Sequence, residues 1–288
     1  VTSGPVYVET IAVLPWTYNT NANLIYIEKM NAVVGSAGQY VTDFRSDAHR
    51  NAANYTESIA ADSLVTAFGN TMADTTAQAT TQPLPQTLGG LSISIVDATG
   101  VERLAPLIYA SPTQVVYQLP AGVSPGLALA TIRAASGFRG TGLFIVSKVA
   151  PGLFSADGSG SGPAAAVAAI FDNAGLLSYA LTATIDPDTN KPVPLPVGIA
   201  PPDRITVLEL FGVGIRNFTS SATAHILRQD TPPADLTLPV QYAGPAPGFP
   251  GLDQINVVLP QSLAGAGTVG IQIVADGISS NPVQVQFK

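Results

Sequence analysis

A pattern of residues recurs in the second half of the chain at a constant offset of 140 residues. The matched residues, in order, are Gln114, Val115, Tyr117, Leu119, Pro120, Thr131, Arg133, Gly137, Leu143 and Ile145, against Gln254, Ile255, Val257, Leu259, Pro260, Ile271, Ile273, Gly277, Val283 and Val285. Phe68-Gly69 matches Phe211-Gly212 at an offset of 143 residues, as expected if one loop differs in length. Proline lacks the donor of a strand ladder, so each Leu-Pro marks a strand end. The repeat predicts two modules with one strand order.

Short runs of alternating apolar and polar residues, separated by Gly and Pro, predict many short strands. The strand-length runs are 91–96, 114–119, 127–133, 143–146, 205–211, 254–259, 269–274 and 283–287, and residues 168–181 read as a hairpin closed by Asp172-Asn173-Ala174-Gly175. In two segments, 58–64 and 164–170, a helical turn competes with a strand. The pattern predicts an all-β chain.

At 288 residues, the chain is long enough for two cores. We expect two tandem Ig-like β-sandwich modules, at residues 49–148 and 149–288, and an extra strand-rich N-terminal element at residues 1–48. The N-terminal element matches neither repeat. Its strand candidates are residues 6–14, 23–29 and 39–44.

The surface is expected to be poor in charge and to associate with other chains. Charged residues make up 11% of the sequence and hydrophobic residues 46%, whereas about 25% charged is typical of soluble domains. Exposed apolar patches usually mark contacts, so self-association is the first expectation. The 12 Lys and Arg are scattered and the net charge is −7, which argues against a nucleic-acid surface.

The sequence gives weaker indications of location. No apolar stretch approaches the ~20 residues that span a bilayer. Cysteine is absent, which is compatible with a bacterial outer surface. A chain that starts at Val1 resembles a product from which an export signal has been removed. We therefore expect a secreted protein, extracellular or at the cell surface.

Candidate site residues are few. The spacing of Asp186, Asp188 and Asn190 offers oxygens to Ca²⁺, but Lys191 and Val197 replace the Gly and Glu of a calcium loop, which favours an ordinary acidic turn. Four aromatic residues gather in the N-terminal element and are candidates for an interface or a glycan-binding face, with core packing as the alternative. They are Trp16, Tyr18, Tyr26 and Tyr40.

Nothing in the sequence indicates catalysis or a cofactor. The two histidines, His49 and His225, lie far apart along the chain, so a triad or a histidine metal site would need a long-range coincidence. The glycine-rich segment 157–162 lacks the Lys of a phosphate loop and is interpreted as a flexible connection. We expect a protein that is not an enzyme and binds no cofactor.

Several motifs occur in a familiar order: LPQTLGG (84–90), ASPTQ (110–114), VAPGLF (149–154), and YAGP (242–245) followed by PGLDQIN (250–256). Together they resemble a family of uncharacterised secreted bacterial proteins with paired C-terminal Ig-like, TIG-like modules. The resemblance covers residues 49–288. It implies the fold and export, and it brings no catalytic residues.

These observations favour an extracellular structural protein, a subunit of a filament or surface assembly that forms by β-strand addition between subunits. Residues 1–48 would then be the connector to a neighbouring subunit. The alternative is a secreted adhesin that binds a glycan or a cell-surface protein through loops or the aromatic N-terminal strands.

Overall fold

The computed structural model describes residues 7–11, 29–34, 40–41, 48–135, 137–228 and 235–288. The chain forms two compact units, Val1–Ser46 and Asp47–Lys288. The described part is built of strands, and its one short helix is a 3-10 turn at Gln261–Leu263. The all-β prediction is confirmed.

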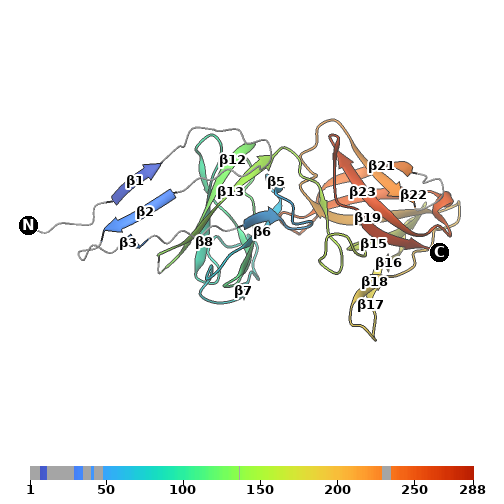
Figure 1. The fold of residues 1–288 in the computed structure, drawn as a ribbon. Helices are drawn as coiled ribbons and strands as arrows, with labels where there is room; N and C mark the ends of the chain where they lie inside the picture. The colour runs from blue at the N-terminus through green and yellow to red at the C-terminus, as the bar shows by residue number, and fades with distance from the viewer. Residues whose placement is uncertain (1–6, 12–28, 35–39, 42–47, 136, 229–234) are drawn as a thin grey trace, which may run out of the picture. The chain divides into compact units, whose positions relative to one another are not determined.

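In the first unit, three strands form an antiparallel sheet in the order β1-β2-β3 (Figure 1). They are β1 (Tyr7–Ile11), β2 (Lys29–Val34) and β3 (Tyr40–Val41). β1 and β3 fall inside predicted strands. The predicted strand at 23–29 shares only Lys29 with β2, and its other residues lie outside the described part.

Two five-stranded sheets enclose the first core of the second unit. One sheet has the order β4-β6-β11-β10-β7 and the other β5-β13-β12-β8-β9. Along β8, Leu91, Ile93 and Ile95 are buried, and the residues between them are half-buried. The apolar and polar residues that alternate in the sequence therefore point to opposite faces of the sheet. The strands are β4 (Ala48–Asn51), β5 (Ser58–Ala60), β6 (Leu64–Phe68), β7 (Ala77–Gln78), β8 (Leu91–Val96), β9 (Glu102–Leu104), β10 (Leu107–Ala110), β11 (Gln114–Gln118), β12 (Gly126–Ala134) and β13 (Gly137–Ser147).

The second core lies within a longer sheet path, β16-β15-β19-β22-β21-β20-β23-β24, with β14 on β19 and β25 on β23. The long strand β21 pairs with β20 through residues 235–239 and with β22 through residues 240–245, so it joins the two layers. The strands are β14 (Gly152–Leu153), β15 (Ala166–Asp172), β16 (Gly175–Leu181), β19 (Ile205–Val213), β20 (Ala222–Leu227), β21 (Asp235–Pro245), β22 (Asp253–Leu259), β23 (Gly267–Ala275), β24 (Ile278–Ser279) and β25 (Val283–Phe287).

The sequence repeat corresponds to equivalent strand pairs. Gln114 of β11 pairs with Phe68 of β6, and Gln254 of β22 pairs with Phe211 of β19 in the same register. β12 lies between β8 and β13 as β23 lies between β20 and β25. The two halves of Asp47–Lys288 therefore share this strand pairing, as the constant offset predicts.

The two segments in which a helical turn competed with a strand, 58–64 and 164–170, contain strands and no helix. Residues 58–60 form β5, parallel to β13, and residues 166–172 form β15, between β16 and β19. Pairing with neighbouring strands outweighs the weak helical preference of the alanines, because each strand satisfies its backbone groups in the sheet.

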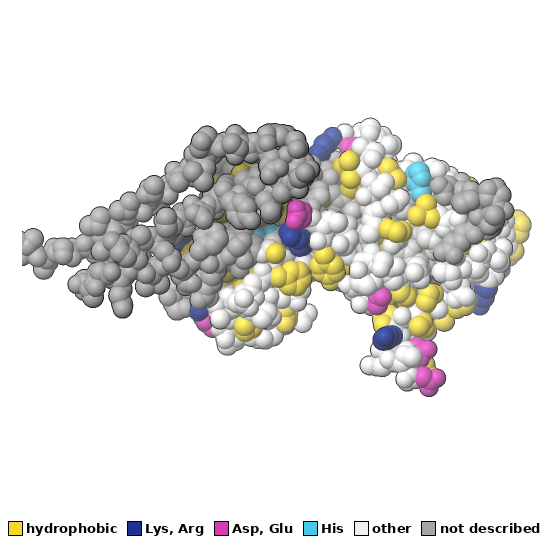
Figure 2. Space-filling model, in the orientation of Figure 1, with side chains coloured by type: hydrophobic (Ala, Val, Ile, Leu, Met, Phe, Trp, Pro, Cys, Tyr) yellow, Lys and Arg dark blue, Asp and Glu magenta, His cyan; other side chains and the backbone are white. Residues whose placement is uncertain are grey.

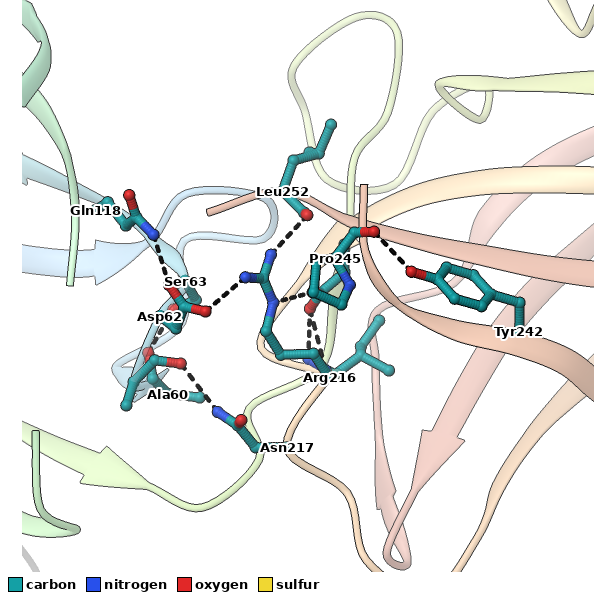
Figure 3. Close-up of polar contacts among 12 residues, drawn as sticks. Ala60, Asp62, Ser63, Gln118, Arg216, Asn217, Tyr242, Pro245 and Leu252 are labelled. Carbon is teal, nitrogen blue, oxygen red and sulfur yellow. Dashed lines mark hydrogen bonds and ion pairs between the residues drawn. The ribbon is translucent and has the colours of Figure 1, made fainter. Parts of the chain in front are cut away.

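A buried arginine joins the two halves of this unit (Figure 3). Arg216 donates from Nε to Asp253 at 2.5 Å, from Nη1 to Asp62 at 2.6 Å and from Nη2 to the Leu252 carbonyl at 2.6 Å. Only 9% of its side chain is exposed, and that of Asp253 is buried completely. Asn217 adds a bond to the Ala61 carbonyl at 3.0 Å. A guanidinium that contacts a carboxylate of each half fixes the junction between them.

Candidate interaction edge

The predicted calcium residues form a capped turn. Asp186 accepts hydrogen bonds from the backbone N–H groups of Asp188 and Thr189, both at 2.9 Å, and these bonds hold the pKa of its carboxyl below the usual value. Asn190 closes the turn with a φ of 53°. The turn connects β17 (Ala183–Ile185) to β18 (Pro192–Pro194). Within the described residues, no group of three or more His, Asp or Glu side chains could hold a metal.

The four aromatic candidates fall in the N-terminal unit. Trp16, Tyr18 and Tyr26 lie outside the described residues. Tyr40 belongs to β3, where its backbone pairs with Val34. Their interaction role stays a prediction.

The two histidines lie apart, in different sheets. His49 of β4 is buried, with Nδ1 2.9 Å from the hydroxyl of Tyr117, and its Nε2 has no hydrogen-bond partner among the described residues. Burial, with a smaller effect of Arg50, lowers the pKa of His49 to about 3. His225 of β20 contacts Thr223 from Nε2 at 3.1 Å. An imidazole that stays neutral inside a core serves packing.

The glycine-rich segment is held in place, contrary to the prediction of a flexible connection. Asn281 donates to the carbonyl oxygens of Gly160 and Leu153 at 2.6 and 2.8 Å. Asp157 accepts from the N–H of Ser159 at 3.0 Å. A Cβ at Gly162 would meet the carboxylate of Asp157, which would then have to move. Sequence composition alone did not reveal these long-range bonds.

The surface that stands out is the outer edge of β16. This strand ends its sheet and pairs on one side only, with β15. Asp172 accepts from the N–H groups of Ala174 and Gly175 at 2.7 and 3.1 Å, which fixes the tight turn between the strands, as the predicted hairpin requires. At the other end, Thr182 is buried and donates its hydroxyl between the carbonyls of Ala164 and Ala166, 2.9 Å from each.

All seven residues of β16 are exposed, although the strand is apolar. Leu176, Leu177, Tyr179 and Leu181 are 45%, 47%, 58% and 62% exposed. An edge strand of a sandwich normally buries every second residue against the opposite sheet. Here neither face is covered, so β16 offers water both its apolar side chains and its unpaired backbone groups.

A β-bulge divides the strand. Leu176 pairs with Phe171 and Ser178 with Ile170, so Leu177 has no partner in β15. The section from Ser178 to Leu181 is regular. Ala180 lies on the face shared with Ala168, which belongs to the second core. Tyr179 and Leu181 lie on the opposite face, since paired residues point the same way.

Among the described residues of Asp47–Lys288, the other strands that end a sheet path are shorter than β16 or protected. The terminal strands β4, β5, β7, β9 and β24 have four, three, two, three and two residues. In β4, the N–H of Asn51 donates to the Thr56 carbonyl and its own carbonyl accepts from Tyr55, so a turn already occupies that edge. β9 carries Glu102 and Arg103. Shortness, charge and covering turns are the usual ways to prevent strand addition, and β16 has only its bulge.

More apolar side chains surround this edge. Ile205, which pairs with Phe171 on the far side of β15, is 47% exposed, and Ile185 and Leu195 of the β17–β18 region are 54% and 37% exposed. Figure 2 shows hydrophobic side chains where the projecting β17–β18 hairpin meets the sheet, with the charges at its tip. The apolar surface therefore continues beyond the strand.

Sequence reasoning located the hairpin but missed the importance of β16. The sequence of Gly175–Leu181 is unusual for an edge strand, because it has no charged residue and no strict alternation of apolar and polar residues. That pattern usually indicates a strand buried on both faces. Whether another sheet covers it depends on contacts far away in sequence.

No known protein family matches the chain, and no curated protein is recognisably similar to it. The resemblance to secreted proteins with paired Ig-like modules therefore stays a prediction. No helix in the described residues has the length and hydropathy needed to cross a membrane.

Proposed function

We propose that this chain is a subunit of an extracellular filament or surface assembly, and that subunits associate by strand addition at β16. The observation that carries the proposal is a seven-residue, uncharged edge strand whose side chains are all exposed. The low share of charged residues, 11%, supports the same function, because it leaves apolar surface that another chain can cover.

Strand addition suits this edge for two physical reasons. The backbone groups on the outer side of β16 can form a ladder with any extended segment. The exposed leucines and Tyr179 lose water when a neighbouring strand covers them, which contributes about 25 cal/mol for each Å² of apolar area buried. An apolar sheet face without a free edge would provide only the second contribution.

The test is negative-stain imaging and size analysis of the full chain over a range of concentrations, with two variants. Tyr179→Lys places a charge on the edge, and Phe249→Lys is the matched control, because Phe249 is an equally exposed aromatic residue, at 64%, in a loop of the same unit. We expect ordered assemblies for the parent chain and for Phe249→Lys. For Tyr179→Lys, we expect the concentration that gives half-association to rise about tenfold, a change of about 1.4 kcal/mol.

Two results would contradict the proposal. A parent chain that stays monomeric at high concentration would exclude self-assembly and favour the secreted adhesin. Equal loss of assembly in both variants would show that exposed aromatic residues in general, and not the β16 edge, hold the copies together.

A further inference from the structure

The regular section of β16 can pair with its own copy. It is free of charge, so an antiparallel partner of the same sequence brings no like charges together. We propose that β16 pairs with β16 of a second copy around a two-fold axis at Ala180. This inference rests on the proposed self-association and specifies the partner, direction and register of this one contact. A two-fold pair is closed, so a filament or surface layer needs a second contact elsewhere on each pair.

The position of the axis follows from the geometry of the strand. In an antiparallel pair, directly opposite side chains point to the same face. A two-fold axis that passes between two residues would place neighbours in sequence opposite each other, and neighbours point to opposite faces. The axis must therefore fall on a residue.

The bulge selects among the possible residues. An axis at Tyr179 or Ser178 would bring the unpaired Leu177 into the new ladder, where the alternation of faces is broken. An axis at Ala180 confines the ladder to Tyr179–Leu181. Thr182 already has a partner, since its carbonyl accepts from the N–H of Leu195 at 2.8 Å, and this also excludes an axis at Leu181. The bulge then lies outside the contact.

The side chains match in this register. Tyr179 of each copy lies opposite Leu181 of the other, on the face away from the core, which gives two aromatic–aliphatic pairs. The small side chain of Ala180 lies opposite itself on the core side. The two most exposed large side chains of the strand, 58% and 62% exposed, are the ones that become covered.

The absence of cysteine from the chain makes the register directly measurable. Each of the variants Ser178→Cys, Tyr179→Cys and Ala180→Cys carries a single thiol, and opposite residues of an antiparallel pair have Cα atoms about 4.5–5.5 Å apart, within disulfide reach. The variants are oxidised with a glutathione buffer, and dimers are quantified on non-reducing gels and by intact mass. Circular dichroism confirms that each variant is folded.

We expect Ala180→Cys to form several-fold more disulfide dimer than either of the other two variants. A mixture of Tyr179→Cys and Leu181→Cys should give mixed dimers, because these positions face each other across the axis. Neither product should form when the protein is diluted below the association concentration before oxidation.

Three results would overturn the inference, and they are distinguishable. Greater cross-linking at Ser178 or Tyr179 would place the axis elsewhere. Ordered assemblies without cross-linking at Ala180 would mean that a different partner occupies this edge, while the proposed function stands. A parent chain that does not associate would refute the proposed function and this pairing together.

Discussion

The buried His49 makes the stability of the first core depend on pH. Its pKa is about 3 in the folded chain, against 6.5 for an exposed histidine, because burial disfavours the imidazolium. Below pH 6.5 the unfolded chain binds a proton that the folded chain excludes, so the free energy of unfolding falls as the pH is lowered. Between pH 7 and pH 5 the loss is about 2 kcal/mol, since each unit of pKa difference corresponds to about 1.4 kcal/mol.

Urea unfolding at pH 7 and pH 5, followed by circular dichroism, measures this loss. The variant His49→Gln should be less stable at pH 7, because the fit beside Tyr117 and Phe144 is disturbed, but it should lack the loss between the two pH values. His225→Gln is the control, and it should keep that loss. Asp97 and Asp276, whose pKa values are lowered by hydrogen bonds, lose their contributions only at more acidic pH.

The reasoning is refuted if His49→Gln loses as much stability between pH 7 and pH 5 as the parent chain does. It is also refuted if the imidazole resonances of His49 titrate near pH 6.5 in the folded protein. Either result would mean that the ring reaches water or accepts a proton without unfolding.

Three substitutions test other parts of the fold. Arg216→Met leaves Asp253 buried without its cation and should lower the free energy of unfolding by about 3–5 kcal/mol in urea titrations; an unchanged midpoint would show that the ion pair adds no stability. Gly214→Ala should lower the melting temperature more than Gly122→Ala, because both glycines have positive φ but only at Gly214 would the new methyl group collide with a backbone carbonyl. Thr182→Val removes the hydroxyl that bonds two buried carbonyls and should lower the free energy of unfolding by about 1–3 kcal/mol. It should also accelerate amide hydrogen exchange in β16, and unchanged exchange would mean that Thr182 does not anchor the strand.

The strands could be predicted where one face is buried. Leu91–Val96 alternates in sequence because one face of β8 lies against the core, so the pattern reports the burial directly. The shared register of β6–β11 and β19–β22 could be predicted as well, because the same residues recur at a constant spacing. These features are local or repeated, and a single sequence contains them.

The candidate site could be predicted only in part. The β15–β16 hairpin follows from the Asp172–Gly175 turn, but its exposure depends on the absence of an opposing sheet, which no local pattern encodes. The Arg216–Asp62 contact joins residues 154 positions apart, and nothing in either neighbourhood indicates the other. The calcium spacing at Asp186 illustrates the reverse case, because a short acidic pattern also suits a capped turn.

The shared register of β6–β11 and β19–β22 also affects how the chain reaches its fold. In the fold, β6 pairs with β11 and β19 pairs with β22 in the same register. Because the sequences repeat, we expect that β6 can also pair with β22, and β19 with β11. During synthesis, β6 and β11 can pair before β19 and β22 exist, since domains generally fold from the N-terminus as they emerge. Refolding from denaturant exposes all four strands at once, and the wrong pairs compete. We therefore expect refolding from denaturant to give more mispaired chains than folding during synthesis.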